Sequence, residues 1–265
     1  MRVYTLMENQ PAGPGYAAEH GLSLYVQAGG RALLVDMGQG DGFLRNAAAL
    51  GVDISQAEAA ILTHGHYDHG GGLGAFYGAN QRAKVYIRRE AFAPHYRADG
   101  GYIGLDPVHI WPSRICWTAD ETRLWPGAYL CTCNGRPMAY GGATEGMYTQ
   151  MGRERQPDDF SHEQYLVLEE GGRRVVFSGC SHKGGMQHCR LAAAGCAHRR
   201  VSPAGGRRPR PGGAGRAAAA GAGGHILYLP LHQPGGLCPA EGHHGRKAPA
   251  AAGRGRGGDM KKAAK

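Results

Sequence analysis

The sequence lacks the long apolar runs and paired cysteines that are typical of membrane and disulfide-rich proteins. No stretch of about 18 apolar residues occurs in the chain, so we expect no membrane span. The first residues, MRVYTLMENQPAGPGYAAEHG, have no apolar core of the kind found in secretion signals, which makes the cytoplasm the default location. The seven cysteines are odd in number and irregularly spaced, which argues against a disulfide framework.

Acidic residues are scarce only near the end of the chain. Residues 1–186 hold 16 Lys and Arg against 19 Asp and Glu, whereas residues 187–265 hold 14 against 2. The net charge of +9 therefore comes from the tail and indicates nothing about the preceding part. The tail stretch VSPAGGRRPRPGGAGRAAAAGAGG has no aromatic residue and no apolar period, so it cannot bury enough surface to offset chain entropy. We expect one domain in residues 1–186 and a largely disordered basic tail in residues 187–265.

The first 186 residues alternate strand-like and helix-like segments, which predicts an α/β protein with layered sheets covered by helices. A helix is expected over residues 42–51, which show apolar residues at helical spacing and end on glycine. The turn Gly171-Gly172 predicts a hairpin over residues 163–179. Strands are predicted for RVYTLM (2–7), LSLYVQAG (22–29), ALLVDMG (32–38), AEAAILTH (57–64), KVYIRR (84–89) and AYLCTC (128–133).

Three histidines and an aspartate crowd into H-G-H-Y-D-H at residues 64–69. His64 and His66 lie two positions apart, so an extended backbone would point both imidazoles to one side. Asp68 and His69 follow where the chain turns into a glycine-rich stretch. A polar surface loop would explain one histidine, but four donors in this order behind an apolar strand predict a metal site. Zinc, or iron or manganese, suits this mixture of nitrogen and oxygen donors.

The motif T-H-G-H-Y-D-H-G-G-G resembles the H-x-H-x-D-H signature of the metallo-β-lactamase fold hydrolases. More narrowly, the sequence resembles the branch of 7,8-dihydropterin-6-methyl-4-(β-D-ribofuranosyl)aminobenzene-5′-phosphate synthase-like proteins. The matching segments run in the family's order over residues 1 to about 184: E-H-G-L-S-L-Y-V, L-L-V-D-M-G-Q, the histidine motif, D-D-F-S-H-E-Q-Y-L-V-L-E and F-S-G-C-S-H-K-G. The resemblance implies an αββα sandwich with a metal site along one edge of its two sheets.

The resemblance also implies two divalent metal ions, with zinc expected. His64 and His66 would bind the first ion, and Asp68 and His69 the second. His162 stands roughly where the family has the third histidine of the first ion, although a polar turn before a strand explains it equally well. Asp36 matches an aspartate that orients a histidine from behind; its alternative is a turn residue at a strand end.

The segment F-S-G-C-S-H matches the place of a bridging aspartate in other members of the family. Cys180 stands there, with His182 two residues on, and we expect one of them to bind metal rather than to be a buried thiol or a surface histidine. Asp159 and Glu163 are expected to be caps or solvated charges. His95 and Tyr96 have two interpretations, residues that face substrate or ordinary surface residues of a helix, and we expect the second.

The family pattern should continue with a helix, G-G-F-H-L, Y-T-C-H-C-T and a final helix, and the written sequence contains none of these. Codons permitted for R-R-V-S-P (199–203), begun one base later, can spell G-G-F-H-L, and L-Y-L-P-L-H (227–232) can similarly continue as Y-T-C-H-C-T. We therefore hypothesise a single-base frameshift near Lys183–Met186, real or a sequencing error. The fold would then be incomplete at its C-terminal end, and the second metal site would lack its last histidine.

The residues predict metal-assisted hydrolysis, or a related transfer, on an ester, lactone or phosphorylated small molecule. Asp68 would position the attacking water, and His182 would assist proton transfer. One alternative is an inactive metal-binding remnant. Another is a nucleic-acid-binding protein that uses the Arg- and Gly-rich tail, although no aromatic residues interleave with its arginines; deletion of residues 190–265 would test it. A homo-oligomer is left open.

Overall fold

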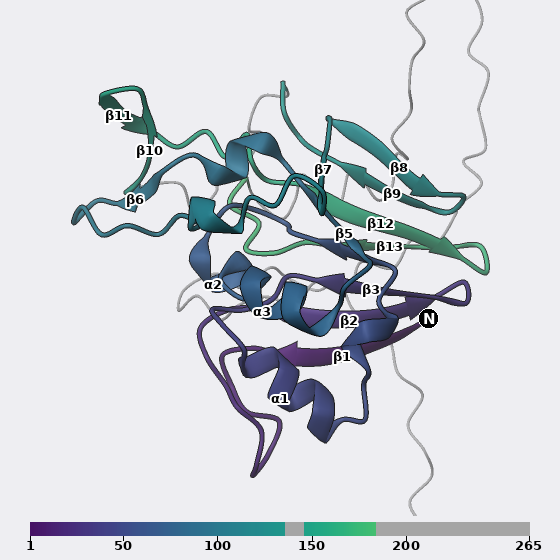
Figure 1. Cartoon of the computed structure of the whole chain (residues 1–265). Coiled ribbons are helices and arrows are strands. Elements are labelled where there is room, and N and C mark those ends of the chain that lie inside the picture. The colour runs from purple at the N-terminus through teal and green to yellow at the C-terminus, as the bar shows by residue number, and fades with distance from the viewer. Residues whose placement is uncertain (136–145, 184–265) are drawn as a thin grey trace, which may run out of the picture. The chain divides into compact units, whose positions relative to one another are not determined.

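A computed structural model describes residues 1–135 and 146–183 (Figure 1). Its larger sheet has six strands in the order β1-β2-β3-β4-β5-β7. The first three pair antiparallel, and β3, β4, β5 and β7 pair parallel. The strands are β1 (Arg2–Met7), β2 (Ser23–Ala28), β3 (Arg31–Val35), β4 (Ala59–Ile61), β5 (Lys84–Ile87) and β7 (Ile115–Trp117).

Helices form the connections between the parallel strands, as such crossovers require. The helix α1 (Gly42–Ala49) joins β3 to β4, and α2 (Tyr67–Gly70) and α3 (Leu73–Ala79) join β4 to β5. Short 3-10 turns complete the connections: η1 (Ile54–Gln56), η2 (Arg89–Phe92) and η3 (Pro107–His109). The helix predicted over residues 42–51 is confirmed.

A second, antiparallel sheet has four strands in the order β13-β12-β9-β8. These are β8 (Glu121–Trp125), β9 (Ala128–Cys131), β12 (Tyr165–Glu170) and β13 (Arg173–Phe177). The predicted hairpin is confirmed, because β12 pairs with β13 and Gly171 and Gly172 both have positive φ, 58° and 73°. A third sheet, in the order β11-β10-β6, joins β6 (His95–Arg97) to β10 (Met147–Met151) and β11 (Glu154–Pro157).

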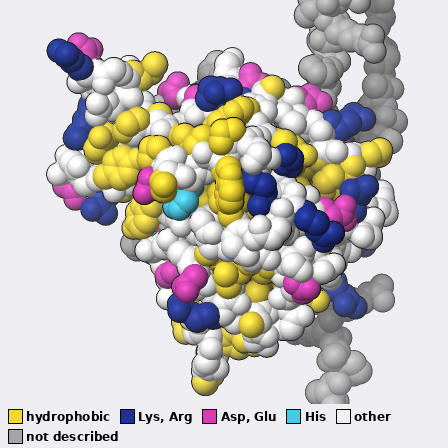
Figure 2. Space-filling model, in the orientation of Figure 1, with side chains coloured by type: hydrophobic (Ala, Val, Ile, Leu, Met, Phe, Trp, Pro, Cys, Tyr) yellow, Lys and Arg dark blue, Asp and Glu magenta, His cyan; other side chains and the backbone are white. Residues whose placement is uncertain are grey.

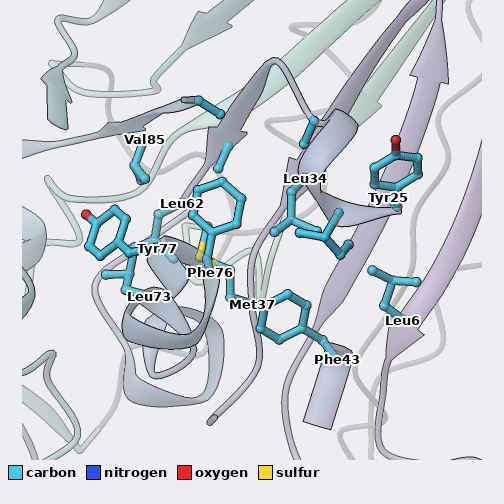
Figure 3. Packing of buried hydrophobic residues seen from close by; sticks show 14 of the residues in the cluster. Leu6, Tyr25, Leu34, Met37, Phe43, Leu62, Leu73, Phe76, Tyr77 and Val85 are labelled. Atoms are coloured by element: carbon cyan, nitrogen blue, oxygen red, sulfur yellow. The ribbon is translucent and has the colours of Figure 1, made fainter. Parts of the chain in front are cut away.

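The core has two layers, one on each face of the larger sheet. Alternation along β3 divides its side chains, because Leu33 and Val35 pack toward the four-stranded sheet and Leu34 packs toward the helices. On the helical side, Phe43 of α1 and Phe76 of α3 are fully buried against the sheet (Figure 3). Helix, sheet and sheet are thus three of the four layers expected. The second helical layer, the domain boundary at residue 186 and the basic tail lie outside the described residues.

The glycines after the histidine motif allow α3 to approach the loop that follows β3. A Cβ on Gly72 would lie 2.2 Å from the Met37 carbonyl oxygen and 2.6 Å from that of Gly40. Both atoms belong to backbone, so a side chain at this position forces the two segments apart.

We therefore expect Gly72→Ala to lower the free energy of unfolding by about 1–3 kcal/mol, as overpacking does in other cores. Gly78→Ala is the matched control: Gly78 lies within α3, which Gly72 precedes as its N-cap, and a Cβ on Gly78 meets nothing within 4 Å. Because alanine favours helix over glycine by about 1 kcal/mol, the control should be neutral or stabilising. Urea denaturation measures both; equal stability of the two variants would contradict the close approach.

Candidate metal centre

The loops that follow the parallel strands carry most of the polar residues singled out in the sequence. Asp36 follows β3, and His64 and His66 follow β4. The ring centroids of His64 and His66 are 4.7 Å apart, so the two imidazoles meet as the motif predicts. The other predicted site residues join them from three directions: Asp68 and His69 in α2, His162 before β12, and Cys180 and His182 after β13.

These side chains are buried, except for the half-buried Cys180. The histidines among them are at most 4% exposed and Asp68 is 6% exposed. The face in Figure 2 accordingly shows little histidine surface. In a polar surface loop the histidines would lie in solvent, so the interpretation of the motif as such a loop is wrong.

Asp36 connects two parts of the histidine motif. It is fully buried with φ of 54°, a left-handed conformation that aspartate tolerates better than most residues. Its Oδ1 accepts the Thr63 backbone N–H at 2.8 Å, and its Oδ2 accepts the Thr63 hydroxyl at 2.7 Å. Oδ2 also lies 2.7 Å from His69 Nδ1. Asp36 therefore orients a histidine, as the sequence predicts.

The same hydrogen bonds fix which nitrogen of the His64 ring carries the proton. The Thr63 hydroxyl gives its one hydrogen to Asp36, so its oxygen accepts from His64 Nδ1, 3.0 Å away. His64 thus turns a bare Nε2 into the site. His64 Nδ1 is thus connected to the Asp36 carboxylate through the Thr63 hydroxyl. In metal-binding histidines the ring nitrogen that does not bind the metal usually donates a hydrogen bond of this kind.

Cys180 lies against His69, whose Nε2 is 3.1 Å from the sulfur. Burial alone would lower the pKa of His69, but Cys180 and Asp36 outweigh it and raise that pKa well above its usual value. Burial alone would raise the pKa of the Cys180 thiol, and His69 reverses the effect, so the pKa falls. Thiolate character at Cys180 suits a metal ligand. The donor atoms of Asp68, His69 and Cys180 lie within 4.8 Å of one another.

His182 completes a further donor group with His64 and Cys180, also within 4.8 Å. Its ring stacks on Phe160, with centroids 4.5 Å apart and planes 16° apart.

Burial, reinforced by the neighbouring imidazoles, holds the pKa values of His64 and His66 well below the usual value. The two rings are therefore neutral, the form that binds a metal ion.

His95 and Asp158 belong to the site although the sequence did not indicate them. His95 lies on the strand β6 and is 1% exposed, so the expectation of a surface residue on a helix is wrong. Its Nδ1 is 2.7 Å from Asp158 Oδ2. The donor atoms of His66, His95, Asp158 and His162 all lie within 4.8 Å of one another. The four-residue spacing of Asp158 and His162 was a usable signal; His95 had none in its local sequence.

His162 is buried beside His66, with ring centroids 5.5 Å apart. Its Nδ1 accepts the Gly65 backbone N–H at 2.9 Å, and its Nε2 lies 3.4 Å from Asp158 Oδ2. Burial lowers the pKa of the ring.

Glu163, next in the chain, is 1% exposed and accepts from the Tyr165 hydroxyl and the Lys183 backbone N–H, so the expectation of a cap or solvated charge is wrong. The exposed Asp159 accepts the Ser161 N–H, as a cap does.

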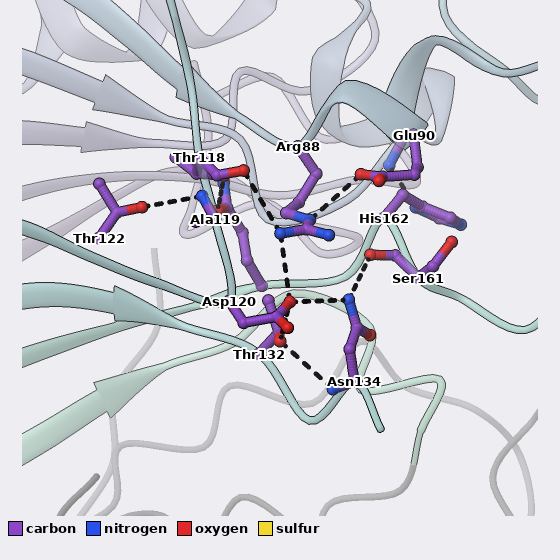
Figure 4. Close-up of polar contacts among 12 residues, drawn as sticks. Arg88, Glu90, Thr118, Ala119, Asp120, Thr122, Thr132, Asn134, Ser161 and His162 are labelled. Carbon is purple, nitrogen blue, oxygen red and sulfur yellow. Dashed lines mark hydrogen bonds and ion pairs between the residues drawn. The ribbon is translucent and has the colours of Figure 1, made fainter. Parts of the chain in front are cut away.

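A polar network supports the loop that carries His162 (Figure 4). Arg88 lies 3.2 Å from a Glu90 carboxylate oxygen and 3.3 Å from one of Asp120. Asn134 donates to both Asp120 and the Ser161 carbonyl. A cavity of about 460 Å³ lies beside the network, and its lining includes Arg88, Asn134, Ser161 and Lys183. Ser161 and Lys183 are the chain neighbours of His162 and His182.

The donor set fits a divalent cation. The Nε2 atoms of His64, His66 and His95 are buried, and none makes a hydrogen bond within residues 1–135 and 146–183. A buried polar atom without a partner costs about 1–3 kcal/mol, so three neighbouring ones fit a positively charged ligand. Within the described part of the chain no helix has the length and apolarity to cross a membrane, and the four cysteines of that part form no disulfide.

Comparison with known proteins places this geometry in a recognised fold. Residues 17–128 match the sequence model of the metallo-beta-lactamase superfamily. A crystal structure described as a metal-dependent hydrolase of the beta-lactamase superfamily superposes with a TM-score of 0.57 and 29% identity, over 69% of this chain and 66% of that one. The chain therefore has the metallo-β-lactamase fold, with mixed α/β sheets.

Curated relatives match over short segments only. Ribonuclease Z of Mycolicibacterium gilvum is 48% identical over 58 residues, which are 22% of this chain and 20% of that protein. An N-acyl homoserine lactonase of Azorhizobium caulinodans is 36% identical over 73 residues, 26% of this chain and 27% of that protein. An uncharacterized protein of Methanocaldococcus jannaschii is 33% identical over 93 residues, 34% and 36% of the two chains. These matches thus span at most about a third of each relative.

Proposed function

We propose that this protein is a metal-dependent hydrolase. The observation that carries the proposal is the set of buried imidazole nitrogens without hydrogen bonds, gathered with a carboxylate and a thiolate at one edge of the sheets. Neutral imidazole, carboxylate and thiolate are the donors that zinc prefers, and iron or manganese would accept most of them. The relatives that match include a ribonuclease and a lactonase, both hydrolases by name.

The proposed centre holds two divalent cations. His64 and His66 would bind the first, with His162 as the third imidazole that the resemblance supplies. Asp68 and His69 would bind the second, with Cys180 between the two sites and His182 beside it. Asp36 would orient His69 directly and His64 through Thr63.

The cations would lower the pKa of bound water and polarise a carbonyl or phosphoryl oxygen of the substrate. Asp68, whose Oδ2 lies 3.3 Å from His20 Nε2 and 3.7 Å from His69 Nε2, would orient the attacking water and accept its hydrogen bond. His182, held by its stack on Phe160, would deliver a proton to the leaving group.

The proposed substrate is an ester, a lactone or a phosphorylated small molecule. The cavity lined by Ser161 and Lys183, the chain neighbours of His162 and His182, is large enough for such a ligand, at about 460 Å³. Its lining holds two cationic side chains, Arg88 and Lys183, and two carboxylates, Asp120 and Asp159, so its charge does not favour one of these substrates over another.

Removal of the metal tests the proposal. Dialysis against a chelator should lower hydrolysis of the responsive substrate by about 10²-fold or more, because a cation supplies several kcal/mol of transition-state stabilisation. Zinc, manganese or iron should restore it. The panel contains phosphomonoesters, phosphodiesters, esters and lactones. An unchanged rate after verified metal removal would exclude the mechanism, and metal binding without turnover of any panel member would indicate an inactive remnant.

Two narrower proposals concern the substrate and the gene. Handling of a pterin or ribofuranosylaminobenzene phosphate would follow from the branch that the sequence resembles, and such compounds belong in the panel. The frameshift would explain the charge of residues 187–265 and the missing family motifs together. Resequencing the gene decides it, because a gene whose other frame does not encode those motifs would exclude the idea.

A further inference from the structure

His95 lies near His66 but on the strand β6, outside the sequence segments that match the family. We propose that His95 binds this cation through Nε2, and that Asp158 positions the His95 ring. The inference rests on the proposed function, because it assumes that the cluster binds a cation, and it replaces His162 by His95 as the third imidazole.

Spacing admits His95 to the site. Its ligand atom lies within 4.8 Å of those of His66, Asp158 and His162. Ligand atoms at about 2.1 Å from one zinc ion lie at most about 4.2 Å apart, so shifts of some tenths of an ångström would close the cluster around an ion.

Hydrogen bonds distinguish His95 from His162. His95 donates its Nδ1 proton to Asp158 at 2.7 Å, so its buried Nε2 holds a lone pair and makes no hydrogen bond among the described residues. His162 instead accepts the Gly65 N–H at Nδ1, which places the ring proton on Nε2. That proton faces Asp158 Oδ2 at 3.4 Å. In these ring orientations the lone pair of His95 Nε2 can bind a cation, whereas His162 Nε2 carries a proton and cannot.

Backbone pairing holds His95 and Asp158 in these positions. His95 is opposite Thr149 in the β6–β10 ladder, and its carbonyl accepts the Ile103 N–H at 2.8 Å. Asp158 Oδ1 accepts the Phe160 N–H at 2.8 Å, which leaves Oδ2 for the two rings. The carboxylate is thus fixed behind His95, as the partner of a metal-binding histidine usually is.

The test compares zinc affinity and zinc content per chain in the parent protein, His95→Gln, His162→Gln and the control His109→Gln. His109 lies in η3, outside the cluster. His95→Gln should lose one equivalent of zinc, or bind it at least about 100-fold more weakly. His162→Gln and the control should stay within a few-fold of the parent. Asp158→Asn should weaken binding by about 10- to 100-fold.

Melting curves in chelator establish that each variant folds. If His95→Gln does not fold, anomalous scattering from zinc-loaded crystals of the parent decides the assignment: an ion next to His95 Nε2 supports it. An ion bound by His162 Nε2 and distant from His95, or zinc loss in His162→Gln with normal binding in His95→Gln, overturns it. A parent that binds no cation would instead contradict the proposed function.

Discussion

Replacement of His66 by alanine should remove a cation and lower hydrolysis by about 10²- to 10⁴-fold. His66 is 4% exposed, and its ring lies 4.7 Å from that of His64, 4.9 Å from that of His182 and 5.7 Å from that of His95. His95 and His182 are attached to other backbone segments, and the His64 ring is held at Nδ1 by Thr63, so none of these imidazoles takes its place. The loss should appear in kcat, since the cations act on the transition state rather than on binding alone.

Metal content separates this expectation from simple unfolding. His66→Ala should retain its circular dichroism spectrum and its melting transition in chelator, while zinc per chain falls. His109→Ala, outside the cluster, is the matched control and should keep both metal and activity. Equal zinc content in His66→Ala and the parent would refute the assignment of His66 as a ligand.

Asp36→Ala should lower the free energy of unfolding by about 3–5 kcal/mol, the largest stability effect we expect from a single residue. The variant leaves the Thr63 N–H, the Thr63 hydroxyl and His69 Nδ1 without their acceptor in a fully buried position. Alanine also tolerates the φ of 54° at this position less well than aspartate. Urea denaturation in the presence of a chelator measures the effect without a contribution from metal binding.

Two further variants sharpen the comparison. Asp53 is an exposed aspartate that caps η1 by accepting the Ser55 N–H, so Asp53→Ala should cost much less stability than Asp36→Ala. Asp36→Asn keeps the shape and the tolerance of positive φ, but it turns an amide N–H₂ toward a neighbouring donor. Its cost should lie between those of the two alanine variants. If Asp36→Ala were no more destabilising than Asp53→Ala, the role of Asp36 in holding the loops together would be wrong.

The part of the site that the sequence could predict is the part encoded in contiguous motifs. His64, His66, Asp68 and His69 form one short string, and a strand end followed by glycines dictates their approach to one another. Cys180 and His182 share the second string, F-S-G-C-S-H. Both strings follow strands that runs of apolar residues predicted, β4 and β13.

His95 could not be predicted in this way. It reaches the site through the pairing of β6 with β10, which joins residues about 50 positions apart, and short strands of mixed polarity give no local sign of their partner. The strand expected over residues 57–64 is also shorter than predicted, at Ala59–Ile61. Beyond it, the Thr63 N–H bonds to the Asp36 carboxylate instead of to a neighbouring strand.

The central claim is that these buried side chains bind divalent metal. The most direct test is elemental analysis of the purified full chain after incubation with zinc and removal of unbound ion. We expect between one and two zinc ions per chain, released by chelator and bound again afterwards. A chain that folds yet retains no zinc, manganese or iron above the level of a non-binding reference protein would contradict the account.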